Sequence, residues 1–91
     1  MTLETVVVQD PDLVSSELDD YTMLMSIEAG KFYSINPLGS QIWQLLERPT
    51  ALRDVCASLQ SEYDVTPEQC GAETVAFVNR LLGQGLVRVQ G

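Results

Sequence analysis

The sequence contains no histidine, and it has only two cysteines and a single lysine among its 91 residues. Histidine is the commonest general base in enzymes, and without it the usual pairs of nucleophile and base cannot be assembled. Structural zinc sites normally use four Cys or His ligands, which this chain cannot supply. We therefore expect a protein that is not an enzyme and that carries neither a metal nor a cofactor.

The two cysteines, Cys56 and Cys70, fall in segments with helical patterning. Disulfides are disfavoured in a reducing compartment, so we expect two small buried thiols. Cys70 is predicted in the first turn of its helix, where the helix dipole would lower the pKa of a thiol. Because no histidine partner exists, we do not expect Cys70 to act as a nucleophile.

The sequence also lacks any run approaching the roughly 20 apolar residues that span a bilayer. Met1 is followed by TLETVVVQD, which has neither the basic start nor the apolar stretch of a signal peptide. Hydrophobic residues still make up 45% of the chain, enough for one core. We expect a single soluble, cytoplasmic domain over residues 1–91, with no membrane partner.

Basic residues are scarce, and the formal net charge is −8. The excess of acidic over basic residues is concentrated in residues 1–47, where eight acidic residues are balanced only by Lys31. Such a surface repels phosphate backbones, so a nucleic-acid partner is not expected. It suits solubility or a basic partner.

Four segments before residue 36 have strand-like composition. They are residues 4–8, the weaker 13–18, then 21–28 and 31–35. The last two are predicted to form a hairpin with a two-residue loop, in which Gly30 takes a positive φ. In that register Glu28 faces Lys31, and Leu24 faces Ile35.

Three helices are expected next, over about residues 37–47, 51–63 and 67–82. Asn36 and Thr66 each precede a proline, and an N-cap followed by proline marks a helix start. Thr50 is the expected N-cap of the second helix, and residues 86–90 form an extended tail. The order predicts an α+β fold of the winged helix-turn-helix type, with three N-terminal antiparallel strands, of which 31–35 is the third, followed by three helices.

Winged-helix proteins often bind DNA through basic and amide side chains on a recognition helix. The third helix offers Gln69, Asn79 and Arg80, but also Glu68 and Glu73, in a chain of charge −8. DNA binding is therefore the least favoured of the functions considered.

Peptide binding fits the aromatic segment KFYSI, residues 31–35, better. A strand at an unprotected sheet edge has free backbone groups that can accept an added strand from a peptide. Phe32 and Tyr33 would then be candidate walls of a groove. Because alternate residues of a strand face opposite sides, we expect one of these two aromatics to pack on the helices.

Three stretches carry a family resemblance: GKFYSINPLGSQIWQLLE, VCASLQSEYDV and VAFVNRLLGQGLV. Their order and spacing, across residues 20–87, resemble the PqqD-like family, known as precursor-peptide recognition elements of ribosomal peptide pathways. Trp43 and the Tyr63-Asp64-Val65 link are similar to the small stand-alone members of lasso-peptide clusters.

The resemblance implies that the leader of a precursor peptide adds as a strand to residues 31–35 and lies between that strand and the third helix. Lasso leaders of this kind carry a Tyr-x-x-Pro motif. The implied further partners are a leader peptidase of cysteine-protease type and, later, an ATP-dependent cyclase resembling asparagine synthetase. The alternative is a PqqD-type chaperone for another modified peptide, such as the pyrroloquinoline quinone precursor.

The implied peptide-binding set has a strand part and a helix part. The strand part is Lys31, Phe32, Tyr33, Ser34 and Ile35. Helical spacing puts Glu73, Ala76, Phe77 and Arg80 on one edge of the third helix and Val75, Asn79 and Leu82 on the other. We predict that the first edge faces the leader, because it combines an aromatic with two charges. The sequence departs from the family at Thr74, where relatives often have an acid; here the acid is one residue earlier, at Glu73.

Overall fold

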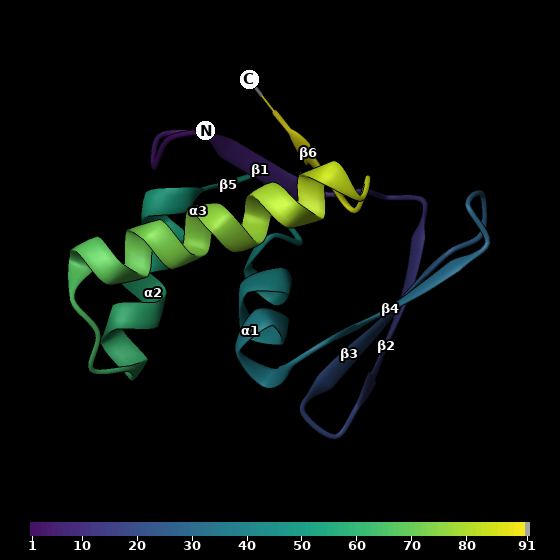
Figure 1. Cartoon of the computed structure of the whole chain (residues 1–91), viewed down its shortest axis with the longest axis horizontal. Helices are drawn as coiled ribbons and strands as arrows, with labels where there is room; N and C mark the ends of the chain where they lie inside the picture. Colours follow the sequence, from purple (N-terminus) through teal and green to yellow (C-terminus); the bar gives the residue numbers. More distant parts are fainter. Residues whose placement is uncertain (91) are drawn as a thin grey trace.

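Two antiparallel sheets and three helices make up the part of the chain that the computed structural model describes, residues 1–90 (Figure 1). In chain order the elements are β1 (Val6–Gln9), β2 (Leu13–Leu18), β3 (Tyr21–Ser26), β4 (Lys31–Ile35), α1 (Pro37–Leu45), β5 (Thr50–Ala51), α2 (Leu52–Glu62), α3 (Pro67–Gly83) and β6 (Val87–Val89). The α+β prediction is confirmed. The three strands expected before the helices form one sheet, in the order β2-β3-β4.

The register of the β3–β4 hairpin differs from the prediction. Leu24 lies opposite Tyr33 instead of Ile35, because the loop spans residues 27–30 and is longer than expected. Side chains alternate with a period of two, so this two-residue shift keeps the same side chains on the helix side of the sheet. Gly30 has the predicted positive φ, at 66°.

The second sheet joins segments that are far apart in the sequence, in the order β5-β1-β6. The extended tail predicted at the C-terminal end supplies β6 to this sheet. Strand β5 was not predicted, and the expectation that Thr50 caps the second helix is wrong. The N-cap is Ala51, and the Thr50 hydroxyl instead donates to the Leu45 and Arg48 carbonyls at 2.9 and 2.8 Å.

The first and third helices begin where the sequence predicts. The Asn36 side chain accepts a hydrogen bond from the Gly39 N–H at 2.8 Å, and the Thr66 hydroxyl accepts one from the Gln69 N–H at 3.1 Å. In both helices proline holds the first helical position, where no backbone N–H is needed. The Asn36 cap fixes where the chain turns from β4 into α1, and the Thr66 cap fixes where α3 begins after α2.

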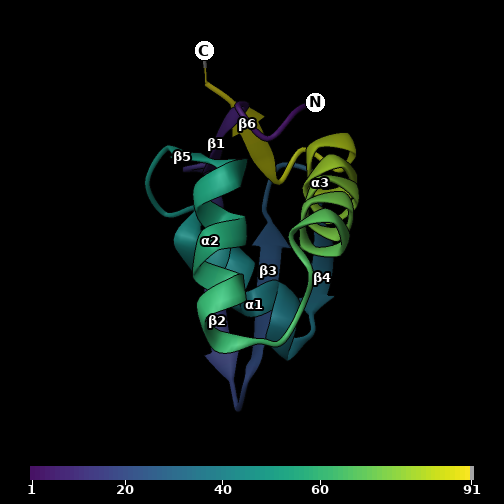
Figure 2. The same cartoon turned by 90° about the vertical axis from the view of Figure 1, so that its left-hand side faces the viewer.

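The helices pack on only one face of the β2-β3-β4 sheet, with α3 beside β4 (Figure 2). Leu24 and Ile35 point from the sheet into the core, where they meet Trp43 of α1 and Val78 of α3. Burial of such apolar side chains is the main stabilising term in folding. No helix within residues 1–90 combines the length and apolar character needed to cross a membrane.

Candidate functional site

Strand β4 is an edge strand, since within residues 1–90 it pairs only with β3. Its side chains alternate: Ile35 is buried, Tyr33 is half-buried against the core, and Phe32 is 72% exposed. One of the two aromatics therefore packs toward the helices, as predicted, and it is Tyr33. The free backbone edge of β4 lies toward α3 (Figure 2).

A cavity of about 280 Å³ separates β4 from α3. It is lined by Tyr33, Ser34, Ile35 and Asn36 on the strand side, and by Phe77, Arg80, Leu81, Gln84 and Leu86 on the helix side. The backbone of an edge strand thus borders an open channel instead of a packed interface. This is the geometry that strand addition requires.

A second, larger cavity of about 360 Å³ lies where α3 meets α1 and α2. Its lining is largely apolar and comprises Asn36, Leu38, Gly39, Ile42, Leu59, Tyr63, Val65, Cys70, Glu73, Thr74, Ala76, Phe77 and Arg80. Asn36, Phe77 and Arg80 line both cavities, so the two adjoin. We call the two cavities together the groove.

Phe77 sits at the junction of the two cavities, and Gly39 makes its position possible. A Cβ atom at Gly39 would lie 2.9 Å from Cζ of Phe77 and 2.6 Å from Cγ2 of Ile35. Real side chains do not approach so closely, so only glycine lets the Phe77 ring and the end of β4 meet the first turn of α1. Strand β4, helix α1 and helix α3 meet at this point and form the wall of the groove.

The groove carries one cation and one carboxylate. The Arg80 guanidinium lies 5.8 Å from the centroid of the Phe77 ring, within the range of a cation–π contact. Glu73 lines the larger cavity and accepts a hydrogen bond from Gln69 at 3.4 Å. Arg80 has no carboxylate partner among the described residues, and it can therefore take an acidic group from a ligand.

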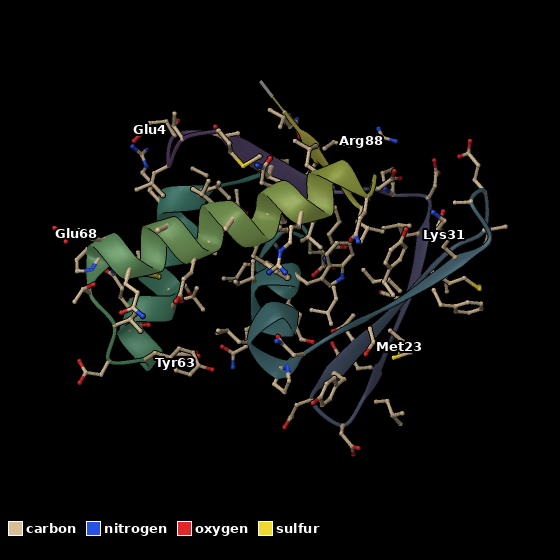
Figure 3. The ribbon with its side chains drawn as sticks, viewed as in Figure 1. Glu4, Met23, Lys31, Tyr63, Glu68 and Arg88 are labelled. Carbon is tan, nitrogen blue, oxygen red and sulfur yellow. The ribbon has the colours of Figure 1, made fainter. Side chains whose placement is uncertain are left out.

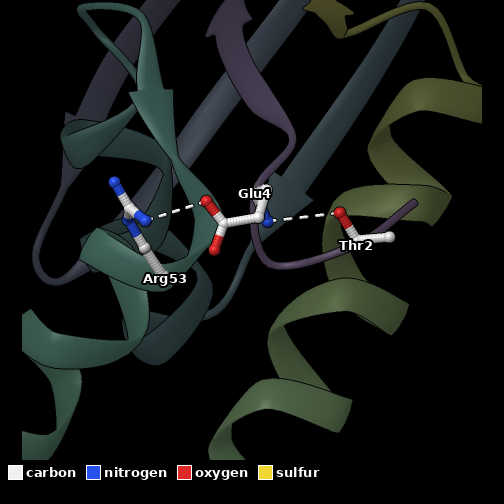
Figure 4. Close-up of polar contacts among 3 residues, drawn as sticks. All are labelled: Thr2, Glu4 and Arg53. Atoms are coloured by element: carbon white, nitrogen blue, oxygen red, sulfur yellow. Dashed lines mark hydrogen bonds and ion pairs between the residues drawn. The ribbon is translucent and has the colours of Figure 1, made fainter.

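The ion pairs found in residues 1–90 lie outside the groove. Arg53 pairs with Glu4 at 2.8 Å, and the Glu4 N–H donates to the Thr2 hydroxyl at 3.2 Å (Figure 4). Arg88 pairs with Asp10 at 3.6 Å. Exposed pairs of this kind contribute little to stability, and here they join the N-terminal segment to α2 and to β6.

Comparison with known proteins identifies the family. The sequence model described as "Coenzyme PQQ synthesis protein D (PqqD)" matches residues 21–87, well over half of the chain. The chain belongs to the PqqD family. No curated protein matches the sequence.

Two solved structures share the PqqD-like fold of this chain. "TbiB1 in Complex with the TbiA(beta) Leader Peptide" is 24% identical, with a TM-score of 0.83 over 92% of this chain and 95% of that one. "Lasso peptide synthetase B1 complexed with the leader peptide" is 23% identical, with a TM-score of 0.81 over 90% of this chain and 96% of that one. At these identities the likeness establishes the fold.

Within this PqqD-family structure, most of the predicted site residues come together. Tyr33, Ser34, Ile35, Glu73, Ala76, Phe77 and Arg80 line the groove, whereas Lys31 and Phe32 do not. Val75, Asn79 and Leu82, on the other edge of α3, line neither cavity. The predicted set did not include the other residues that line the groove. They are Asn36, Leu38, Gly39, Ile42, Leu59, Tyr63, Val65, Cys70, Thr74, Leu81, Gln84 and Leu86.

The helical spacing of Leu38 and Tyr63 predicts that both face inward, yet they are 43% and 40% exposed and line the larger cavity. A helical apolar pattern marks the inward face but does not reveal where that face borders a cavity. Thr74 is buried, and the acid one residue earlier, Glu73, lines the larger cavity.

Both cysteines are buried, and Cys70 lines the larger cavity. Burial raises the pKa of the Cys70 thiol, so the expectation of a lowered pKa is wrong: loss of solvent outweighs the helix dipole. Its Sγ donates to the Cys56 carbonyl at 3.8 Å, and both thiols are free and buried, as predicted. Residues 1–90 contain no cluster of His, Cys, Asp and Glu side chains suited to a metal ion.

Proposed function

We propose that this PqqD-family protein binds the leader of a ribosomally made precursor peptide as an added strand on β4. The observation that carries the proposal is the free edge of β4 beside the groove, whose larger cavity is lined mainly by apolar side chains. The backbone of β4 would supply the hydrogen-bond ladder, and the groove would take alternate side chains of the leader. The proposed site comprises Lys31, Phe32, Tyr33, Ser34 and Ile35 on the strand and Glu73, Ala76, Phe77 and Arg80 on the helix. Lys31 and Phe32, which do not line the groove, would contribute through their backbone.

We infer that the protein acts in the biosynthesis of a lasso peptide. Both structural relatives were solved with a leader peptide, and one is described as a lasso peptide synthetase. In this role the protein performs no chemistry and works in the cytoplasm without a cofactor. It presents the bound precursor to a leader peptidase of cysteine-protease type and then to an asparagine-synthetase-like cyclase.

The affinity should be moderate. A leader is flexible and loses conformational entropy on binding, so a few anchors and the backbone ladder must supply the free energy. Affinities from micromolar to tens of nanomolar correspond to about −8 to −10 kcal/mol. A groove with one central aromatic, Phe77, and one cation, Arg80, fits this range.

The test is fluorescence anisotropy of a labelled leader from the neighbouring precursor gene, titrated with the protein. A scrambled leader and a DNA duplex are the controls. Saturable binding of the true leader alone, at micromolar or tighter, is expected. Equal affinity for the scrambled leader, or salt-dependent binding of the duplex, would contradict the proposal.

A second candidate is a PqqD-type chaperone for another modified peptide. The observation that favours it is the matching family model, whose description refers to synthesis of the coenzyme PQQ. The same titration with a pyrroloquinoline quinone precursor separates the two functions. Tighter binding of that peptide than of the lasso leader would favour the second.

A further inference from the structure

The two charged side chains of the groove lie toward different ends of it. Among the described residues that line either cavity, only Glu73 and Arg80 carry a charge. Glu73 lines the larger cavity alone, whereas Arg80 also lines the smaller cavity beside β4. The groove therefore has a negative side chain toward the start of α3 and a positive one toward β4.

Helix geometry fixes the separation of these two charges. Glu73 and Arg80 are seven residues apart on α3, which is about two turns, so both project from the same side of the helix. At 1.5 Å of rise per residue, their Cα atoms lie about 10 Å apart along the axis. Phe77 lies between them, and the Arg80 guanidinium is 5.8 Å from the centroid of its ring.

Neither charge is neutralised by an ion pair within residues 1–90. The ion pairs found there involve other side chains, and Glu73 accepts only a hydrogen bond from the neutral Gln69 amide, at 3.4 Å. Both groups are exposed to solvent, so a ligand can reach them without first breaking an internal contact. One bound peptide with two opposite charges could pair with both.

The end of the groove at which α3 begins is surrounded by further acids. Glu62 and Asp64 are the exposed neighbours of Tyr63, which lines the larger cavity, and Glu68 lies in the first turn of α3. Figure 3 shows Tyr63 and Glu68 at this end of the molecule. Residues 54–79 contain no Lys or Arg. The negative charge of Glu73 is therefore reinforced, and a basic group is favoured there.

The direction of β4 relates these two charges to the direction of the leader. The strand runs toward Asn36, which lines both cavities, and the larger cavity lies beyond that end. Antiparallel pairing is the more stable arrangement, so an added strand would run the opposite way. The N-terminal part of the leader then lies near Glu73, and the part that follows lies near Arg80.

The spacing of the charges in the leader follows from the same geometry. An extended chain advances about 3.3 Å per residue, so about 10 Å corresponds to roughly three residues. Side chains on the same side of a strand are an even number of residues apart. Two matching charges in the leader are therefore expected about two or four residues apart.

We propose that the groove selects leaders by the order of their charges: a Lys or Arg beside Glu73, followed about two or four residues later by an Asp or Glu beside Arg80. This inference rests on the proposed function and names the class of peptide that the same site takes. The backbone ladder of an added strand can slip in register. A leader bound in reverse would place like charges together, which is unfavourable. The two charges would thus fix both register and direction.

The test exchanges the two charges in the protein. Glu73→Arg/Arg80→Glu keeps the net charge of −8 and reverses only the order. The probe is the labelled synthetic leader of the neighbouring precursor gene, titrated by anisotropy at low salt. We expect binding to weaken about tenfold, because two attractions become two repulsions. Glu47→Arg/Arg48→Glu, an exposed pair outside the groove, is the matched control and should bind like the wild type.

Substitutions in the leader identify the matching residues. Each charged residue of the leader is changed in turn to Gln, and each peptide is titrated against the wild type, Glu73→Gln and Arg80→Gln. One Lys or Arg should lose about three- to fivefold in affinity for the wild type but nothing for Glu73→Gln. One acid, later in the leader, should show the same relation to Arg80→Gln. Both couplings should shrink at high salt.

Wild-type affinity in the folded Glu73→Arg/Arg80→Glu variant would overturn the inference, and so would an acid coupled to Arg80 that precedes the base coupled to Glu73. Circular dichroism checks folding. If the exchange variant does not fold, the two Gln variants decide, since they change little in size. If the wild type does not bind the leader, the proposed function fails. If the leader binds and neither charge couples to it, only the selection by charge order is wrong.

Discussion

Both sheets of this protein have three antiparallel strands, but they differ in how much of their edges and faces is left exposed. In β5-β1-β6 the central strand has a partner on each side, and Val7 within it is fully buried. That sheet is also tied to the helices, since Gln9 donates to the Trp43 carbonyl at 2.6 Å. In β2-β3-β4 one edge borders the groove and one face is bare. The first sheet is tied to the helices, whereas the second leaves a backbone edge and several apolar side chains exposed.

This division predicts that substitutions around the first sheet change the free energy of unfolding, whereas those around the second change affinity. The largest expected effect is on Leu52, which is fully buried where β5 leads into α2. Leu52→Ala should lower the free energy of unfolding by about 2–5 kcal/mol, because it leaves a cavity. Urea denaturation measures this.

Leu18→Ala is the matched control for Leu52→Ala, since the same side chain is removed from a site that is 68% exposed. We expect a change within about 0.5 kcal/mol. Equal destabilisation by the two variants would contradict the division between the sheets.

Gly39→Ala should affect both stability and binding, since it forces a Cβ between Ile35 and Phe77. We expect a loss of about 1–3 kcal/mol in stability, typical of overpacking, and weaker leader binding as the Phe77 ring is displaced. Thermal unfolding and anisotropy measure the two effects. Gly83→Ala, where the added Cβ meets no atom within 4 Å, is the control and should lower neither stability nor leader affinity.

Phe77→Ala tests the groove wall. The variant should fold and should bind the leader about 10- to 100-fold more weakly, as removal of a central aromatic anchor does. The control is Val75→Ala, a half-buried apolar truncation on the other edge of α3, which lines neither cavity. If Val75→Ala weakened leader binding as much, the leader would lie on the other edge of the helix.

Arg80→Glu is expected to have the smallest effect. Arg80 lines both cavities and has no carboxylate partner among the described residues. A leader that places an acidic residue beside Arg80 should therefore bind the Arg80→Glu variant about three- to tenfold more weakly than the wild type. A leader with that acid changed to Lys should recover affinity for the variant. Arg48→Glu, an exposed site outside the groove, is the control. Equal losses in both variants would show a general charge effect.

The sequence predicted the parts of the fold that depend on local chemistry. Asn36-Pro37 and Thr66-Pro67 specify their helix starts within a few residues, and both were confirmed. Gly30 took its positive φ for the same reason. The predicted hairpin register was wrong because register depends on loop length, and the residues of the loop, 27–30, carry no signal that fixes that length.

Non-local structure was harder to predict. Strand β5 has only the residues Thr50 and Ala51, and it exists because β1 and β6 assemble beside it. The composition of residues 31–35 suggested a groove at a strand edge, and the family resemblance implied that it lies between this strand and the third helix. Helical spacing alone left two edges of α3 open. The structure places Phe77 and Arg80 in the groove because Gly39 admits the Phe77 ring, a contact that no spacing rule reveals.

Amide hydrogen exchange of the protein with and without the leader peptide tests the central claim most directly. Strand addition satisfies the free backbone edge of β4, so residues 31–35 should gain protection, together with the groove side of α3. The β5-β1-β6 sheet should change little. Saturating leader that left β4 unprotected, or that protected only elements away from the groove, would contradict the account.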